Sequence, residues 1–214
     1  MKVVLIGIAR LGSSRLPGKV LFDLGGAPVL RWIWEAADSA ALVDEIVIAT
    51  TTKPEDDAIE AICKENGIRC YRGSEDDVLT RFVGAAITAQ ATVAVRVTCD
   101  CPFIDPTIID QVIALREAHN ADYASNIDPP TWPDGMDCEA ITVDALALAK
   151  HGATSKIDRE CVTTYIQRNK HRFKCVNLTC PLPDMHKERW VLDTVNDYEL
   201  CKRIADEEAC PTGG

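Results

Sequence analysis

The stretch VVLIGIARLGSSRLPGKVL, residues 3–21, joins an apolar run to a loop rich in turn-forming and cationic residues. The apolar run at 3–8 predicts a buried strand that begins the fold. The loop behind it carries Arg10, Arg15 and Lys19, which is more positive charge than a solvated turn needs. We therefore expect an anion to bind where the first strand ends, and a phosphate chain is the obvious candidate. A plain solvated turn is the alternative.

Outward from this stretch, short apolar runs alternate with longer amphipathic ones through the first 125 residues. Such alternation predicts a mostly parallel sheet with helices on both faces. Ligands of these folds bind at the carboxyl ends of the strands, so the polar loops that follow the strands should face one crevice. We expect strands at 3–8, 45–50, 68–71, 92–98 and 122–125, and helices at 29–39, 54–66, 77–89 and 106–119.

The rest of the chain departs from this alternation. Residues 126–142 are rich in Pro, Asp and Gly, which predicts a hairpin arm inserted in a single domain that spans 1–214. Beyond the arm we expect helices at 156–169 and 195–208, and short strands at 173–178 and 190–192.

Composition excludes several classes of protein. With 214 residues and no long apolar segment, the chain is typical of a soluble cytoplasmic domain. Its net charge of −10 argues against a nucleic-acid or membrane-surface binder. The first loop lacks both G-x-G-x-x-G and G-x-x-x-x-G-K-[ST], which disfavours an NAD oxidoreductase and excludes a Walker loop. The ten cysteines include no C-x-x-C, so we expect reduced, mostly buried thiols rather than structural zinc, and surface positions for the four histidines.

Two aspartates follow expected strands. Asp100 comes after the strand at 92–98, and Asp193 comes after the one at 190–192. Carboxylates at neighbouring strand ends can share one Mg²⁺, which takes oxygen ligands and usually keeps substrate phosphates in its shell. Asp193 has a second interpretation, because either it or Thr194 precedes a helix and could be the N-cap of that helix.

Other charged residues fall in and after the expected arm. Asp134 precedes Gly135, and a turn alone would explain that pair. Glu139 is flanked by apolar residues and looks less like a solvated charge. Arg159 lies in a helical stretch, where it is either an ordinary ion-pair partner or a binder of an acidic substrate.

Six segments resemble motifs of one enzyme family, in that family's order. They are ARLGSSRLPGKVL (9–21), EDDVLTRF (75–82), RVTCDCPFIDP (96–106), YASNIDPPTWPDGMDCEAIT (123–142), DRECVTTYI (158–166) and RWVLDTVNDYEL (189–200). As a set they resemble the cytidylyltransferases that activate acidic sugars. The closest resemblance is to the spore-coat polysaccharide cytidylyltransferase family, and the acylneuraminate and 3-deoxy-manno-octulosonate cytidylyltransferases are more distant relatives.

The resemblance implies a Rossmann-like nucleotidyltransferase fold and a Mg²⁺-dependent transfer of CMP from CTP to an acceptor, with release of pyrophosphate. It implies that Arg15 and Lys19 hold the triphosphate and act with Asp100 in catalysis, and that Asp100 and Asp193 bind the metal. The remaining candidate nucleotide contacts are Ala9, Arg10, Gly12, Ser13, Asp77 and Arg81. The candidate acceptor contacts are Asp134, Gly135, Asp137, Glu139, Arg159 and Glu160. The family commonly has His where this chain has Cys161, a difference that bears on the acceptor.

Three functions stay open on the sequence alone. The first is a cytidylyltransferase that acts on an acidic sugar for surface-polysaccharide precursors. The second is the same enzyme acting on a phosphorylated or phosphonate metabolite. The third is a non-catalytic nucleotide-binding protein, which the joint presence of Arg15, Lys19, Asp100 and Asp193 disfavours. The expected partners are CTP, a small acidic acceptor and a second copy of the chain in a homodimer, with no nucleic acid and no membrane.

Overall fold

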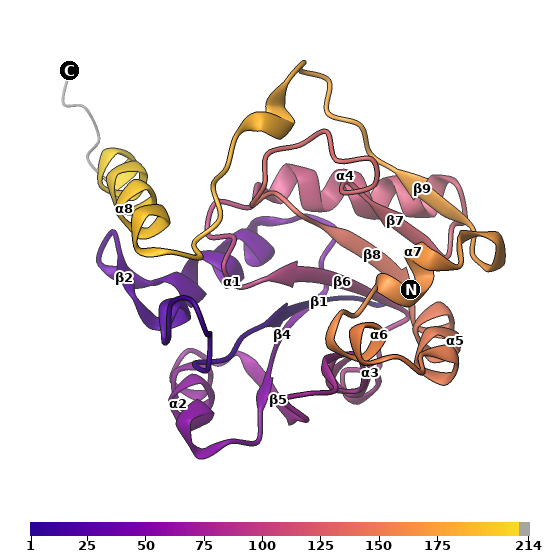
Figure 1. The fold of residues 1–214 in the computed structure, drawn as a ribbon, viewed down its shortest axis with the longest axis horizontal. Coiled ribbons are helices and arrows are strands. Elements are labelled where there is room, and N and C mark those ends of the chain that lie inside the picture. The colour runs from indigo at the N-terminus through magenta and orange to yellow at the C-terminus, as the bar shows by residue number, and fades with distance from the viewer. Residues whose placement is uncertain (210–214) are drawn as a thin grey trace.

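A seven-stranded sheet forms the centre of the computed structural model, which describes residues 1–209 (Figure 1). Its strand order is β5-β4-β1-β6-β8-β7-β9. Neighbouring strands pair in parallel except at β8, which is antiparallel to both β6 and β7. The expected mostly parallel sheet is therefore confirmed. The strands are β1 (Val3–Ile8), β4 (Glu45–Thr51), β5 (Arg69–Gly73), β6 (Val93–Thr98), β7 (Tyr123–Ser125), β8 (Glu139–Thr142) and β9 (Cys175–Asn177).

Helices cover both faces of this sheet, so its strands are buried on both sides and read as nearly continuous apolar runs. One core cluster joins Leu5 and Val95 to α1, α2 and α4. The other joins Ile6 and Ala94 to α3, α5 and α7. The helices are α1 (Val29–Ser39), α2 (Asp57–Glu65), α3 (Val78–Thr88), α4 (Pro106–Ala118), α5 (Val143–Gly152) and α7 (Thr164–Arg168).

The position of β1 decides where a site can form. It lies between β4 and β6 and pairs in parallel with both, so that Ile8 is opposite Ala49 on one side and Thr98 on the other. The carboxyl ends of the three strands therefore meet at one edge of the sheet. The cation-rich loop after β1 and the Asp100 segment after β6 leave the sheet side by side, as the sequence predicts.

A third, smaller core cluster holds the last helix, α8 (Val195–Ala209), against the start of the chain. Cys201 and Ala205 of α8 pack with Leu24 from the short hairpin of β2 (Asp23–Leu24) and β3 (Ala27–Pro28). Figure 1 shows α8 beside β2. This contact brings the segment that precedes α8 close to the loop after β1.

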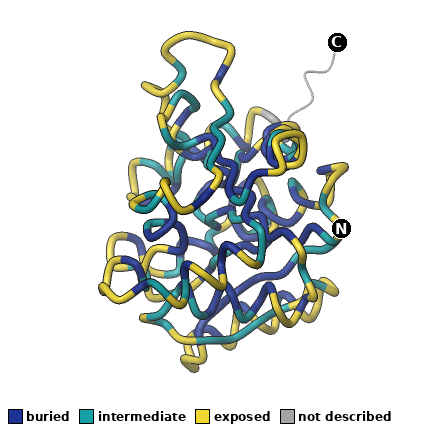
Figure 2. Tube along the Cα trace, turned by 90° about the vertical axis from the view of Figure 1, so that its right-hand side faces the viewer, coloured by how far each residue is buried: buried dark blue, intermediate teal, exposed yellow. Residues whose placement is uncertain are grey.

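The expected arm at 126–142 is an antiparallel hairpin whose strands belong to the main sheet. Residues 139–142 are β8, and residues 126–138 form the loop that joins β7 to β8. The segment that stands out from the molecule is instead 179–189, which includes the 3₁₀ turn η4 (Met185–Lys187) and is exposed for most of its length (Figures 1 and 2).

Two expected elements differ. The helix expected at 156–169 is two short helices, α6 (Lys156–Glu160) and α7, because Cys161 has an extended backbone with φ −119° and ψ 114°. The β-branched run that follows Cys161 weakens helical continuity. The strand expected at 190–192 is absent from the described sheet, since the neighbouring chain is the β7–β8 loop and not a strand. A single bridge between Asp134 and Arg189 is formed there.

The remaining general expectations can be checked on residues 1–209. Their nine cysteines are free thiols and six of these are buried, whereas Cys210 lies outside the described residues. All four histidines are exposed. No described helix combines the length and the apolar character that a membrane span needs.

Gly135 holds the β7–β8 loop against the segment before α8, and it provides the first test. Its φ is +108°, and a Cβ there would lie 2.7 Å from the Trp190 carbonyl carbon. Gly26 also has a positive φ, of +84°, but nothing lies within 4 Å of the position that a Cβ would take there. We expect Gly26→Ala to cost about 1–2 kcal/mol of folding free energy, from the left-handed backbone alone.

Gly135→Ala should cost roughly twice as much or more, because backbone atoms must also move. Chemical denaturation of both variants measures the difference. Equal losses of stability in the two variants would contradict this packing.

Candidate active site

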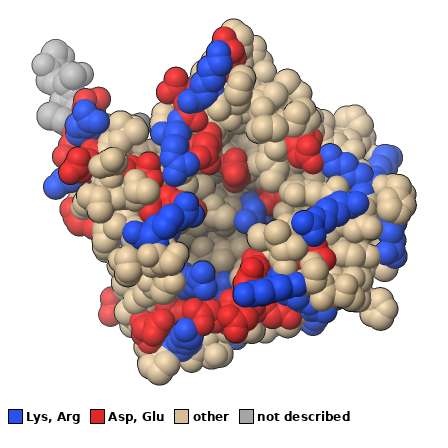
Figure 3. Space-filling view, in the orientation of Figure 1, with Lys and Arg blue, Asp and Glu red and all other residues tan. Residues whose placement is uncertain are grey.

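A cavity of about 280 Å³ lies at the carboxyl ends of β1 and β6. Figure 3 shows a hollow in this face of the molecule with Lys and Arg side chains around it, although the net charge of the chain is −10. The sequence therefore predicts the place of the cavity and the sign of the charge beside it. Eight predicted site residues line it: Arg10, Ser13, Arg15, Lys19, Arg81, Asp100, Glu160 and Asp193.

Lys19 lies between the two aspartates that the sequence singles out. Its Nζ donates to Asp100 Oδ2 at 2.7 Å and to Asp193 Oδ1 at 2.9 Å, and only 7% of the residue is exposed. Arg15 Nη1 lies 2.5 Å from the other oxygen of Asp193. Burial opposes ionisation of Asp100, but Lys19 outweighs it and lowers the pKa of that carboxyl. Asp100 is thus ionised at neutral pH.

Backbone bonds bring Asp193 to this place. The Leu192 N–H donates to the Asp100 carbonyl at 2.7 Å, so the residue before Asp193 is fixed beside β6. Thr194 and Asp197 form a capping box at the start of α8: the Thr194 N–H donates to Asp197 Oδ2 at 2.8 Å, and the Asp197 N–H donates to Thr194 Oγ1 at 3.3 Å. The N-cap is therefore Thr194, and the carboxylate of Asp193 is left for the cavity.

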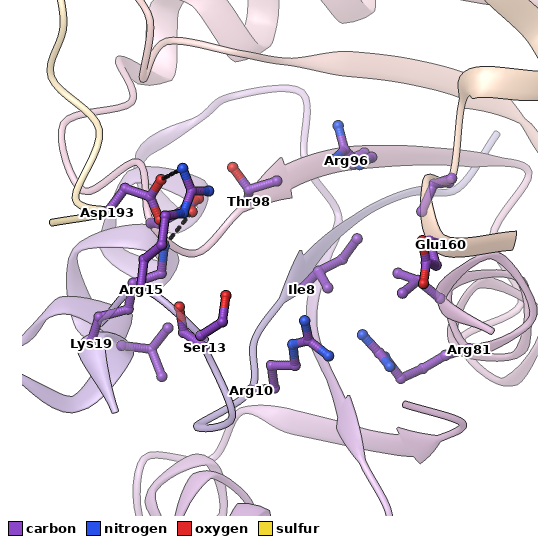
Figure 4. Close-up of a pocket in the computed structure, with 15 residues that line it drawn as sticks. Ile8, Arg10, Ser13, Arg15, Lys19, Arg81, Arg96, Thr98, Glu160 and Asp193 are labelled. Carbon is purple, nitrogen blue, oxygen red and sulfur yellow. Dashed lines mark hydrogen bonds and ion pairs between the residues drawn. The ribbon is translucent and has the colours of Figure 1, made fainter. Parts of the chain in front are cut away.

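Two arginines stand on the other side of the cavity. Figure 4 shows Arg10 and Arg81 pointing toward one another, away from Lys19 and Asp193. Arg10 pairs with Glu75 at 3.4 Å. Arg81 is 1% exposed and donates to backbone carbonyls, among them Ser74. Burial and the nearby Arg10 lower the pKa of Arg81 to about 10, so it keeps its charge but lacks a carboxylate partner in these contacts. This side of the cavity suits an anionic or electron-rich ligand group.

Asp56, which the sequence analysis does not single out, clamps the cationic loop. It is 1% exposed, and its Oδ1 accepts from the Leu11 N–H at 2.8 Å. The Thr51 hydroxyl donates to its other oxygen. In the acidic run PEDD (54–57), Asp56 looks like part of a helix start, and α2 does begin at the next residue, Asp57. The run itself carries no sign of the contact with Leu11, which is 45 positions away.

Three predicted nucleotide contacts, Asp77, Ala9 and Gly12, and one predicted acceptor contact, Arg159, lie outside the cavity lining. Asp77 caps α3, because Asp77 Oδ1 accepts from the Thr80 N–H at 2.8 Å. Arg159 pairs with Asp77 at 3.2 Å and so ties α6 to α3, which is the ordinary ion-pair interpretation. Ala9 is buried at the end of β1, and Gly12 packs near Glu55. None of these four residues lines the cavity.

The predicted acceptor residues of the β7–β8 loop also lie outside the lining. Asp134 pairs with Arg189, and its backbone carbonyl accepts from the Trp190 N–H at 2.7 Å. Together with Gly135 it docks the loop on the segment before α8. Glu139 is fully buried on β8. For Asp137, burial and the nearby Asp134 raise the pKa of the carboxyl to about 6.

Seven lining residues were not among the predicted ones, and Arg96 is the charged one. It interrupts the apolar run of β6, between Val95 and Val97. A cation inside a buried strand needs a partner, which was a usable signal in the sequence. Ser14 belongs to the loop that the sequence predicts to bind phosphate. The others are apolar or hydroxyl-bearing residues without such a signal: Ile8, Val20, Val78, Thr98 and Val162.

The donor set fits the expected Mg²⁺. Asp100 and Asp193 place oxygens of both carboxylates within 2.9 Å of one cationic nitrogen, so the position between them already favours positive charge. Mg²⁺ is commonly held by one or two carboxylates plus substrate phosphates. No cluster of three or more His, Cys, Asp or Glu ligands occurs within residues 1–209, so a protein-only metal cage is not formed there.

The parallel sheet, the cationic loop after β1 and the paired carboxylates at the strand ends together define a nucleotidyltransferase. The cytidylyltransferase family model matches residues 4–210. The chain therefore belongs to the cytidylyltransferase family, and the enzyme class expected from the sequence is confirmed.

Similar proteins agree with this assignment. An uncharacterized protein of Methanocaldococcus jannaschii is 38% identical over 94% of this chain and 82% of its own length. The Bacillus subtilis spore coat polysaccharide biosynthesis protein SpsF is 34% identical over 92% of this chain and 83% of its own. A cytidylyltransferase structure from Leptospira borgpetersenii has a TM-score of 0.89 at 33% identity, covering 94% of this chain and 85% of that one.

A more distant structure shares the fold alone. The CMP:2-keto-3-deoxy-manno-octonic acid synthetase complexed with CTP has a TM-score of 0.75 at 18% identity, covering 97% of this chain and 100% of that chain.

Removing the Asp56 clamp should loosen the cationic loop. Asp56→Ala leaves the Leu11 N–H without its acceptor, and we expect a loss of about 1–3 kcal/mol in stability together with weaker binding of a nucleoside triphosphate. The neighbouring exposed Asp57, whose partner is Arg72, is the matched control, and Asp57→Ala should cost at most about 1 kcal/mol. Thermal unfolding and calorimetric titration measure both effects. Indistinguishable variants would rule out the clamp.

Asp137 should make stability depend on pH. Because its pKa is about 6 in the folded protein, it binds its proton more tightly there than in the unfolded chain, so stability falls as pH rises from about 4 to about 6. The melting temperature of Asp137→Asn should equal that of the native protein near pH 4. Above pH 6 it should be about 2–4 °C higher, which corresponds to roughly 1 kcal/mol more free energy of unfolding. Melting curves without added divalent metal test this. A constant difference at all pH values would contradict the assignment.

Proposed function

We propose that this protein transfers CMP from CTP to a small acidic acceptor and releases pyrophosphate. The observation that carries the proposal is the cluster of Lys19 with Asp100 and Asp193, which faces the same cavity as four arginines. The arginines are Arg10, Arg15, Arg81 and Arg96. Four of the five cationic side chains, Lys19 with Arg10, Arg15 and Arg81, and the two strand-end carboxylates suit a triphosphate and its metal, and such a set has no use in a purely structural domain.

The relatives support both substrates. SpsF is described as a spore coat polysaccharide biosynthesis protein. A 3-deoxy-manno-octulosonate cytidylyltransferase of Pseudomonas fluorescens is 34% identical over 52% of this chain. Its acceptor is a sugar acid by name, and the structurally similar synthetase is complexed with CTP. We therefore place the protein in the synthesis of a CMP-activated acidic sugar for a surface polysaccharide.

The cationic loop would supply the charge that the transfer requires. When the acceptor oxygen attacks the α-phosphorus in line, negative charge grows on that phosphorus and on the leaving pyrophosphate. Arg15 is 69% exposed as a side chain and can turn from Asp193 to a phosphate at little cost, because exposed ion pairs are weak. Lys19 is buried and stays in place as a fixed charge. The Asp56 clamp keeps the loop in position for both.

Asp100 and Asp193 would hold Mg²⁺. The bound ion would neutralise phosphate charge and orient the triphosphate. The lowered pKa of Asp100 keeps this carboxylate ionised and ready to ligate well below neutral pH. A structure of similar fold from Mycobacterium tuberculosis, at 13% identity, is described as a complex with manganese, which is in line with a divalent ion in this fold.

Three further expectations belong to the same proposal. The chain acts as one domain from 1 to 214, in the cytoplasm, and as a homodimer. Sedimentation equilibrium gives the mass in solution. A monomer at micromolar concentration would contradict the dimer and leave the chemistry untouched.

The direct test measures pyrophosphate release from CTP, ATP, GTP and UTP with Mg²⁺, against sugar acids, neutral sugars and phosphonates. We expect release with CTP and a sugar acid. Asp100→Asn should reduce the rate by at least about 10²-fold, because a metal ligand and the partner of Lys19 are lost together. The exposed Asp144 on α5 is the control, and Asp144→Asn should keep the native rate. An active Asp100→Asn variant would refute the role of Asp100.

A further inference from the structure

Arg96 occupies the part of the cavity that the phosphate-binding residues leave free. It lies on β6 and lines the cavity, and its side chain extends away from Arg10 and Arg81 in Figure 4. In the sheet register Arg96 is directly opposite Glu139 of β8. Arg96 is not part of the phosphate-binding loop, because it reaches the cavity from the sheet itself.

A buried carboxylate fixes one end of the Arg96 guanidinium. Arg96 Nη1 donates to Glu139 Oε2, and Glu139 has no exposed surface. The other oxygen, Oε1, accepts from the Tyr123 hydroxyl at 2.6 Å. Burial, with Glu139 beside it, raises the pKa of Tyr123, so its hydroxyl keeps the proton that it donates. Both oxygens of Glu139 are thus occupied, and it acts on Arg96 rather than on a ligand.

The arginine is held but not satisfied. Its Nε is buried without a hydrogen-bond partner, while 20% of its side chain remains exposed. Burial alone would lower the pKa of Arg96, but Glu139 reverses this and the pKa is raised, so the side chain is cationic at every working pH. A fixed, charged guanidinium with donors to spare recognises planar or tetrahedral oxyanions, because its fork matches two oxygens at once.

The charge of Arg96 is not needed to bind the triphosphate. Arg10, Arg15 and Lys19 from the loop after β1 and Arg81 from α3 already face the cavity from two sides. Arg96 lies toward β8, where the buried Glu139 would repel a chain of several phosphates but tolerate one anionic group. Its place and its charge both point to the second substrate.

We propose that Arg96, positioned by Glu139, binds the anionic group of the acceptor, a carboxylate or phosphonate. That the bound group belongs to the acceptor rests on the proposed function, but anion binding at Arg96 can be tested without turnover. It also accounts for the buried charge of Glu139, which the sequence analysis assigns to the acceptor: Glu139 acts through Arg96 and does not touch the ligand.

The test has two measurements on the native protein and two variants. Side-chain ¹⁵N spectra follow the Arg96 Nε–H signal during titration with pyruvate, methylphosphonate and, as a neutral control, glycerol. Calorimetry follows binding of CTP with Mg²⁺. Arg96→Lys keeps the charge and identifies the signal by its loss. Arg96→Met combined with Glu139→Gln removes both charges, so neither is left buried alone. Arg116, a buried arginine outside the cavity, is the internal reference.

We expect the Arg96 signal to shift saturably with both anions, while glycerol leaves it unchanged and the Arg116 signal stays fixed. The CTP affinity of both variants should remain within about threefold of the native value, which is well below a tenfold change, or about 1.4 kcal/mol.

An Arg96 signal that neither anion moves would overturn the proposal. So would a tenfold or greater loss of CTP affinity in Arg96→Lys, because Arg96 would then be a nucleotide contact. Failure of the native protein to bind CTP refutes the proposed function instead, and the anion titration still decides this inference.

Discussion

The attraction of one buried lysine for two aspartates is the interaction on which the rest of the site depends. Lys19, Asp100 and Asp193 come from the loop after β1, the end of β6 and the segment before α8. Without the ammonium group, two carboxylates would face each other in a partly buried place, with only exposed side chains such as that of Arg15 beside Asp193 to balance their charge. The cluster therefore ties the N-terminal loop, the centre of the sheet and the C-terminal helix into one arrangement.

The same electrostatics explains why the cavity is ready for its substrates. A position that draws a lysine between two carboxylates also favours a divalent cation, and cations around that position favour phosphates. The two ends of the cavity then differ in character. The end near the loop after β1 gathers flexible and fixed cations, and the end near β8 offers one arginine whose charge is partly balanced by Glu139. In the proposed reaction, this difference would direct a polyanion to one end and a singly charged group to the other.

The sequence predicts most of the framework because strands buried on both faces and helices with Pro, Asp or Gly at their ends leave local signals. The strands around β1 and the helices between them lie close to the expected bounds. The missing strand at 190–192 depends on tertiary contacts, which local propensity does not encode. The break at Cys161 does have a local signal, the β-branched run at 162–164. Asp193 illustrates a signal that was present: the pattern T-x-x-D at 194–197 is a capping box, and it leaves Asp193 free. Asp56 had no such signal, since its partner Leu11 is distant in the chain.

The central claim is that Asp100 and Asp193 share a cation with the triphosphate. The most direct measurement is the anomalous scattering of Mn²⁺ in crystals of the protein grown with CTP. The account predicts a single strong peak bounded by the Asp100 and Asp193 carboxylates and phosphate oxygens, in the cavity beside Lys19. A peak elsewhere in the molecule, or CTP bound with these two carboxylates still engaged only by Lys19 and Arg15, would contradict it.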